Sequence, residues 1–111
     1  MNTAAHGNFS AGKRLVIFGC GYVGAAVARQ AVARGLHVTA LTRNVAKAEA
    51  LRDEGVSEVV IGDLASAAWH DRIEGGADLV LNCVSSGGGG IDGYRRSYLD
   101  GMASVVAWLR T

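Results

Sequence analysis

The fold of this chain is decided by Leu15-Val16-Ile17-Phe18-Gly19-Cys20-Gly21-Tyr22-Val23-Gly24. The apolar, partly β-branched run from Lys13 to Phe18 predicts a buried strand that ends at a glycine turn. Glycine lacks a Cβ, so Gly19 allows a tight turn, Gly21 admits a ligand close to the backbone, and Gly24 lets a helix pack on the strand. The first N–H groups of that helix and its dipole attract an anion. The stretch therefore predicts a strand, a turn and a helix that hold a phosphate group.

The rest of the chain alternates between strand and helix patterns. Apolar runs predict three further strands at residues 37–42, 57–61 and 77–84. Helical spacing predicts helices at 22–34, from the Asn44 cap to about Glu54, and at 65–73. A last helix is predicted from an Asp92 cap onward, and the residues spaced along one of its faces are Tyr98, Met102, Val105, Val106 and Leu109. The glycine-rich run 85–90 predicts a mobile loop. This alternation predicts a Rossmann-like three-layer α/β/α fold with a truncated parallel sheet of four strands in the order 3-2-1-4.

Composition limits the function classes. The 111 residues are 50% hydrophobic and 19% charged, with a net charge of +1, so we expect a folded domain and no electrostatic basis for binding nucleic acid or an anionic membrane. We expect a flexible leader at 1–12 and one nucleotide-binding domain at 13–111. No apolar run approaches the ~20 residues of a membrane span, and the N-terminus lacks a signal-peptide core, which predicts a cytoplasmic protein. The two cysteines and three scattered histidines predict no disulfide framework and no metal site.

In an open parallel sheet, ligands lie beyond the carboxyl ends of the strands. Four places there carry glycine or polar residues, at 19–24, 42–44, 62–64 and 83–86. The first has the G-x-G-x-x-G spacing of a dinucleotide fingerprint. At the second, an NAD site usually has an acid, whereas this chain has Arg43, 19 residues after Gly24. The permanent charge and forked donors of arginine suit a 2′-phosphate, which favours NADP over NAD; the alternative is that Arg43 is a solvated loop residue.

Two of the other places have open interpretations. Asp63 is either an acceptor for the adenine amino group or a turn aspartate. Ser85 and Ser86 either line the nicotinamide ribose pocket or belong to a flexible linker. We expect no catalytic residue and no metal ligand in the chain. The candidate cofactor-binding residues are Gly19, Cys20, Gly21, Tyr22, Val23, Gly24, Thr42, Arg43, Asn44, Asp63, Leu64, Cys83 and Ser85.

Four motifs together resemble a known family. They are Gly19 to Gly24, Leu41-Thr42-Arg43, Gly62-Asp63-Leu64, and the run from Tyr94 to Gly101. From Lys13 to Leu109 the chain resembles the extended or atypical branch of the short-chain dehydrogenase/reductase superfamily, the NAD-dependent epimerase/dehydratase type. The resemblance implies Gly19, Gly21 and Gly24 at the pyrophosphate, Arg43 at the 2′-phosphate or adenine, Asp63 at the adenine, and Ser85 near the nicotinamide.

The chain also departs from that family. Many relatives carry Asn where this chain has Tyr98, and the family's catalytic Tyr-x-x-x-Lys is absent because Ala26, Tyr98 and Met102 follow the three tyrosines at that spacing. The fifth strand and the substrate-binding part are missing as well. We therefore expect the cofactor-binding portion of a larger NADP-dependent oxidoreductase or nucleotide-sugar-type epimerase/dehydratase, not catalytically complete by itself. The unpaired edge of its fourth strand predicts self-association into a homo-oligomer.

Two other functions fit part of the pattern. One is a regulatory NAD(H)-sensing domain, similar to the domains that gate potassium transport, which share the glycine motif and the Gly-Asp after the third strand. Those domains usually have an acid at the end of the second strand, where this chain has Thr42-Arg43. The other is a structural module that has lost its ligand.

Overall fold

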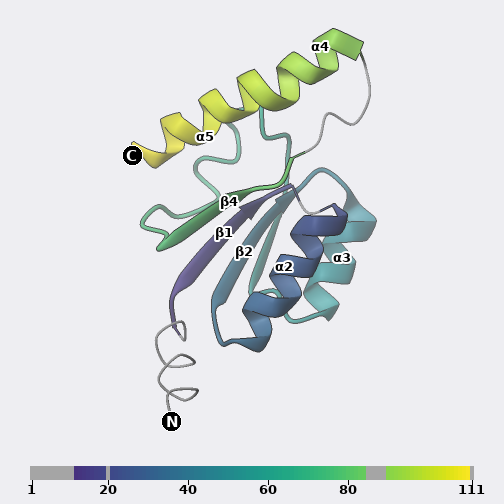
Figure 1. Ribbon diagram of the computed structural model, residues 1–111. Helices are drawn as coiled ribbons and strands as arrows, with labels where there is room; N and C mark the ends of the chain where they lie inside the picture. The colour runs from purple at the N-terminus through teal and green to yellow at the C-terminus, as the bar shows by residue number, and fades with distance from the viewer. Residues whose placement is uncertain (1–11, 20, 85–89, 111) are drawn as a thin grey trace.

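The computed structural model describes residues 12–19, 21–84 and 90–110. Its centre is one all-parallel sheet of four strands (Figure 1). The strands are β1 (Arg14–Phe18), β2 (His37–Thr42), β3 (Glu58–Ile61) and β4 (Leu79–Asn82), in the order β3-β2-β1-β4. The predicted strand order and Rossmann-like architecture are confirmed.

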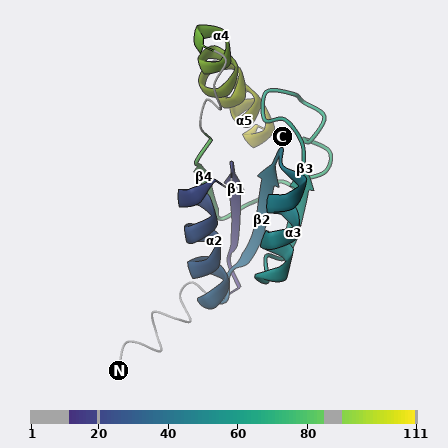
Figure 2. The same cartoon turned by 90° about the vertical axis from the view of Figure 1, so that its right-hand side faces the viewer.

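Two helices cover one face of the sheet (Figure 2). They are α2 (Tyr22–Ala33) and α3 (Val45–Asp53), and they enclose a core that includes Ile17, Ala28 and Leu51. Asn44 caps α3 as predicted, because its Oδ1 accepts a hydrogen bond from the Lys47 amide at 3.0 Å. In the described parts of the chain, no helix has the length and apolar character needed to cross a membrane.

The strand register brings the four carboxyl ends to one edge of the sheet. Phe18 of β1 lies beside Leu41 of β2 and Asn82 of β4, and Thr42 lies beside Ile61 of β3. Backbone hydrogen bonds continue the ladder one residue beyond the strands: Gly19 N to Leu41 O at 3.0 Å, Gly62 N to Thr42 O at 3.0 Å, and Cys83 N to Phe18 O at 2.7 Å. The segments after β1, β3 and β4 are thereby fixed beside the carboxyl ends of the neighbouring strands.

The segment 65–73 forms turns, so the helix predicted there is wrong. Local side-chain hydrogen bonds favour turns over a helix: Asp63 Oδ1 accepts from the Ala65 amide, and Ser66 Oγ accepts from the Ala68 amide, both at 3.0 Å. Trp69 is nevertheless fully buried, and its ring lies 5.0 Å from that of Phe18, centroid to centroid. The indole Nε1 donates to Leu64 O at 3.1 Å, which fixes the ring within the turns, and Trp69 packs with Val16 and Phe18 on the second face of the sheet.

The last helical segment is a continuous run of α4 (Gly90–Tyr94), the π-helical η1 (Arg95–Asp100) and α5 (Gly101–Leu109) (Figure 1). Asp92 lies inside α4, so its predicted role as the cap is wrong. The apolar face predicted for this helix is not the face that packs on the core, except at Val105. The residues that face the core are Gly101, Ser104, Val105 and Trp108, whereas Tyr98, Met102, Val106 and Leu109 are exposed.

The face of α5 that packs on the turns at 65–73 differs from the predicted apolar face because it carries small side chains. A Cβ on Gly101 would lie 3.0 Å from Leu64 Cδ2, so glycine allows the helix to approach closely. Ser104 Oγ donates to Ser66 O at 3.0 Å. Hydrophobic periodicity overlooks small and hydroxyl-bearing residues, although here they form the contact surface.

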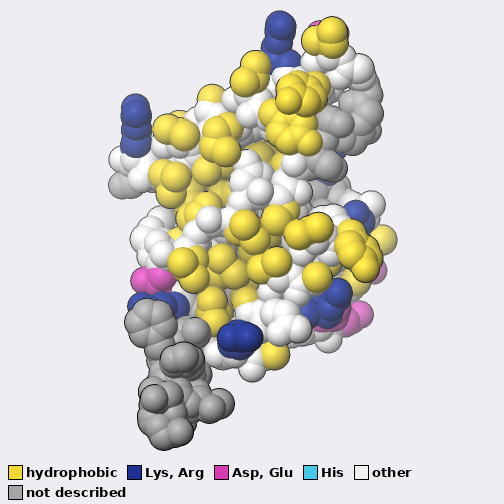
Figure 3. Space-filling model, in the orientation of Figure 1, with side chains coloured by type: hydrophobic (Ala, Val, Ile, Leu, Met, Phe, Trp, Pro, Cys, Tyr) yellow, Lys and Arg dark blue, Asp and Glu magenta, His cyan; other side chains and the backbone are white. Residues whose placement is uncertain are grey.

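Strand β4 forms an edge of the sheet and is shorter than the predicted 77–84. Asn82 Oδ1 accepts from the Val84 amide at 3.0 Å, which turns the chain after Asn82. Within the described residues β4 pairs with β1 alone, and its residues Leu79 and Val80 are 51% and 37% exposed. Figure 3 shows apolar side chains over this side of the sheet and along the outer face of the last helical run.

Candidate functional site

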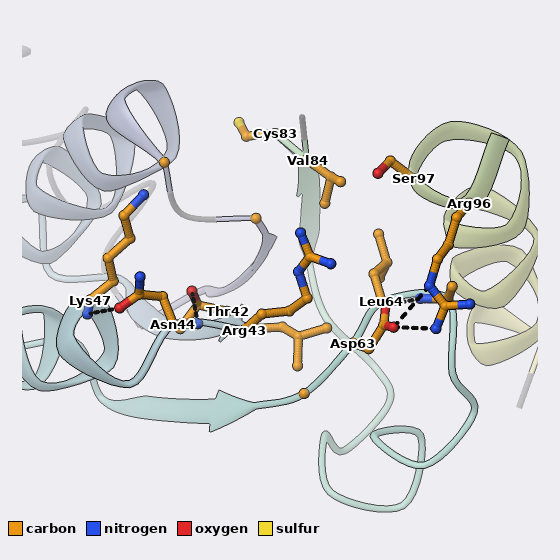
Figure 4. A pocket seen from close by; sticks show the side chains of 15 residues that line it. Thr42, Arg43, Asn44, Lys47, Asp63, Leu64, Cys83, Val84, Arg96 and Ser97 are labelled. Atoms are coloured by element: carbon orange, nitrogen blue, oxygen red, sulfur yellow. Dashed lines mark hydrogen bonds and ion pairs between the residues drawn. The ribbon is translucent and has the colours of Figure 1, made fainter. Parts of the chain in front are cut away.

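A pocket of about 380 Å³ lies at the carboxyl edge of the sheet (Figure 4). Every strand end contributes to it, and the last helical run closes it on one side. Its size is within the usual range of small-molecule sites. The lining residues are Gly19, Gly21, Leu41, Thr42, Arg43, Asn44, Lys47, Gly62, Asp63, Leu64, Ala65, Cys83, Val84, Arg96 and Ser97.

The three glycines of the turn differ in what an added Cβ atom would meet. Gly19 has φ +80°, and a Cβ there would lie 2.6 Å from Val84. A Cβ on Gly24 would lie 2.5 Å from the Gly19 carbonyl oxygen. At Gly21, in contrast, a Cβ would meet no atom of the described residues within 4 Å, although this residue lines the pocket. Packing requires glycine at Gly19 and Gly24, whereas at Gly21 the missing Cβ leaves the backbone open to a ligand.

The N-terminus of α2 adds positive polarity to this part of the pocket. Gly21 is the N-cap residue and has no side chain with which to satisfy the free amides of the first turn. That turn also carries no acidic residue. The amides and the helix dipole therefore favour an anion beside Gly21.

The segment after β2 supplies side chains with positive charge. Thr42 Oγ1 accepts from the Asn44 amide at 3.2 Å, so Thr42 and the Asn44 cap define the path of the chain. The Arg43 side chain points into the pocket, and Lys47 lines it from the first turn of α3 (Figure 4). Lys47 is not among the predicted site residues, although its place three residues after the predicted Asn44 cap puts it at the same end of α3.

Asp63 is the one carboxylate among the residues that line the pocket. Its Oδ1 accepts from the Ala65 amide, and its Oδ2 accepts from Nε of Arg96 at 3.1 Å and from Nη2 of the same guanidinium. Partial burial raises the pKa of Asp63, but the hydrogen bonds from Arg96 and Ala65 and the charges of Arg96 and Arg43 outweigh it and hold the pKa below its ordinary value. Asp63 is therefore ionised at neutral pH.

Arg96 is not among the predicted site residues, because it is 33 residues from Asp63 along the chain. Only the packing of the last helical run on the turns after β3 brings the two together. Of the predicted site residues, Thr42, Arg43, Asn44, Asp63, Leu64 and Cys83 line the pocket together with Gly19 and Gly21.

The remaining predicted residues fall outside this lining. Tyr22 and Val23 have exposed side chains that do not line the pocket. Gly24 acts through packing. Cys20 and Ser85 lie outside the described residues.

A parallel α/β sheet with a glycine turn, a free helix N-terminus and cationic side chains at its carboxyl edge defines a nucleotide-binding domain. The sequence model of the NAD(P)H-binding family matches residues 19–108. The chain belongs to this family. It is an NAD(P)H-binding domain, and its cofactor is a nicotinamide dinucleotide.

Solved structures with the same fold include an epimerase/dehydratase and reductases. The putative NAD-dependent epimerase/dehydratase from Bacillus halodurans has a TM-score of 0.76 and 24% identity, over 89% of this chain and 46% of that one. L-sorbose reductase from Gluconobacter frateurii, solved with NADPH and L-sorbose, has a TM-score of 0.66 and 20% identity, over 90% of this chain and 48% of that one. An actinorhodin polyketide ketoreductase solved with NADPH has a TM-score of 0.70 and 19% identity, over 88% of this chain and 46% of that one.

The chain thus spans about half the length of these structures. No curated protein matches its sequence at a significant level. The family match confirms the predicted dinucleotide-binding class, the solved structures agree with the predicted resemblance in their fold, and no comparison favours the potassium-transport sensor.

Proposed function

We propose that the pocket binds NADP(H) in preference to NAD(H), and that the chain is the cofactor-binding portion of a larger NADP-dependent oxidoreductase or nucleotide-sugar-type epimerase/dehydratase. The observation that carries the cofactor preference is the pair of cations, Arg43 and Lys47, in the pocket beyond β2. An NAD site usually has an acid there, which accepts hydrogen bonds from the ribose hydroxyls. A guanidinium instead donates two parallel hydrogen bonds to a phosphate.

The glycine turn would hold the pyrophosphate. Gly21 offers an open approach to the backbone, and the first-turn amides of α2, including those of Tyr22 and Val23, are free to donate. Cys20, which stands between Gly19 and Gly21 in the sequence, would belong to the same site. When bound, the nicotinamide dinucleotide supplies a hydride donor or acceptor, whereas the residues of this chain bind and orient it.

The other strand ends would position the two ends of the cofactor. Asp63 and Leu64, which line the pocket after β3, would contact the adenine. Cys83, which lies after β4 and lines the same pocket, would border the nicotinamide ribose, together with Ser85.

Proton transfer at a substrate would need residues that this sequence does not contain. The sequence has no Tyr-x-x-x-Lys pair, since its only lysines are Lys13 and Lys47, and Lys47 lines the cofactor pocket. We therefore assign binding to this chain and leave catalysis to the larger protein.

Calorimetric titration with NADPH, NADH and ADP-ribose tests the proposal. A hydrogen bond to a charged group contributes about 1.5–3 kcal/mol, so Arg43→Gln is expected to lower the NADPH-to-NADH affinity ratio by roughly 10- to 150-fold. Lys47→Gln should lower it by less, because an ammonium acts as a single point charge. Arg34→Gln, which removes an exposed arginine at the opposite end of α2, is the matched control. Tight NADH binding with indifference to the 2′-phosphate would contradict the preference for NADP.

A further inference from the structure

Asp63 and Arg96 form an ion pair on the wall of the pocket (Figure 4). Arg96 donates two hydrogen bonds to Oδ2, and the Ala65 amide donates one to Oδ1. Each carboxylate oxygen accepts about two hydrogen bonds, so Oδ2 is saturated and Oδ1 retains one acceptor direction. The carboxylate is fixed at both oxygens and has capacity for one further donor.

The helical run that carries Arg96 is anchored to the same turn as Asp63. Gly101 packs against Leu64, and Ser104 Oγ donates to Ser66 O. Arg96 itself lies in the π-helical segment η1, a distortion that occurs often at functional sites. These contacts set the distance between the helix and the turn, so Arg96 reaches Asp63 from a fixed position although its side chain is 57% exposed.

We propose that Arg96 is a positioning residue that fixes the Asp63 carboxylate. The remaining acceptor of Asp63 then selects adenine, which has an exocyclic amino group, over hypoxanthine, which has a carbonyl at the same position. The inference rests on the proposed dinucleotide site. An amino group donates to a carboxylate, whereas a carbonyl oxygen repels it. Without Arg96, only the Ala65 amide would orient the side chain of Asp63.

The charges around Asp63 agree with this role. Arg96 faces it from η1, and Arg43 acts on it from the segment after β2; both lower its pKa. The acceptor stays ionised through the range in which cofactor binding is measured.

The experiment compares NADPH with reduced nicotinamide hypoxanthine dinucleotide phosphate by calorimetry. For the wild-type chain we expect the adenine cofactor to bind at least about tenfold more tightly, the lower end of what a hydrogen bond to a charged group contributes. Asp63→Ala should bring this ratio close to one. Arg96→Met should lower it to below about threefold, and Arg96→Lys should retain part of it. Arg95→Met removes an exposed neighbouring arginine that does not line the pocket, and should leave the ratio unchanged.

The outcomes separate the two proposals. If the wild-type chain binds neither dinucleotide, the proposed function fails, and the inference fails with it. If the wild type binds NADPH but Arg96→Met keeps the wild-type ratio, only the inference is overturned. Should Arg96→Met not fold, Arg96→Gln takes its place: a lowered ratio supports the inference, and a wild-type ratio overturns it.

Discussion

Replacing Gly21 by alanine separates the cofactor role of the glycine turn from its packing role. Among the described residues, nothing lies within 4 Å of where a Cβ on Gly21 would stand, and the φ of −77° is accessible to alanine. Alanine is a poorer N-cap residue than glycine, but it also lowers the entropy of the unfolded chain. Each effect is about 1 kcal/mol or less and they oppose each other, so we expect the free energy of unfolding to change by less than about 1 kcal/mol.

The expected effect on binding is much larger. The added methyl group would occupy the space through which the pyrophosphate approaches the backbone of Gly21. Overpacking by one methyl costs about 1–3 kcal/mol, which raises the Kd for NADPH by roughly 5- to 150-fold.

Gly24→Ala is the matched control, because the same chemical change meets a different environment. There the Cβ would lie 2.5 Å from the Gly19 carbonyl oxygen, a backbone atom that has no rotamer by which to move away. We expect a loss of stability of about 1–3 kcal/mol, and in a domain of this size each kcal/mol lowers Tm by about 4–8 °C.

Thermal unfolding and calorimetric titration of both variants check this reasoning. The expected pattern is a near-wild-type Tm with weak binding for Gly21→Ala, and a lowered Tm for Gly24→Ala. A Gly21→Ala chain that binds NADPH within twofold of the wild type would refute the assignment of the pyrophosphate to this turn. A large loss of stability in that variant would refute the packing argument.

Three further predictions concern stability and association. Ser104→Ala should lower the free energy of unfolding by about 1–3 kcal/mol in urea titrations, because it leaves the His70 ring nitrogen, 2.8 Å from Ser104 Oγ, without this partner; an unchanged midpoint would contradict the role of the hydroxyl. The pair with Arg96 lowers the pKa of Asp63 in the folded protein. The difference in the free energy of unfolding between wild type and Arg96→Met should therefore be constant above the ordinary aspartate pKa, and it should vanish as the pH falls through the lowered pKa of the folded state. A difference that grows as the pH falls would refute this prediction. The exposed edge of β4 should cause self-association at about tens of micromolar in analytical ultracentrifugation, and Leu79→Lys should weaken it. A monomeric wild type would contradict this prediction.

Local sequence was enough to predict much of the fold. The apolar run ending at Gly19 and the cap at Asn44 act over a few residues, so their structures follow from short-range sterics and hydrogen bonds. The residues after each strand were predicted to meet because parallel strands have their carboxyl ends at one edge. The helix predicted at 65–73 is wrong because side-chain hydrogen bonds compete with helix formation there. The helix predicted near the C-terminus is present, but small residues of α5 form the contact in place of the predicted apolar face.

By itself the sequence determined the class of the fold, the position of the glycine turn and the presence of Arg43 beyond β2, since each depends on residue type and spacing. Only the tertiary structure decided that Arg96 pairs with Asp63, that Lys47 lines the pocket, and that Gly21 is free of packing constraints where Gly24 is not. The physical reason is distance along the chain. Contacts between residues far apart in sequence depend on how the elements pack. The spacing of residues within one element does not indicate which residues of another element it will contact.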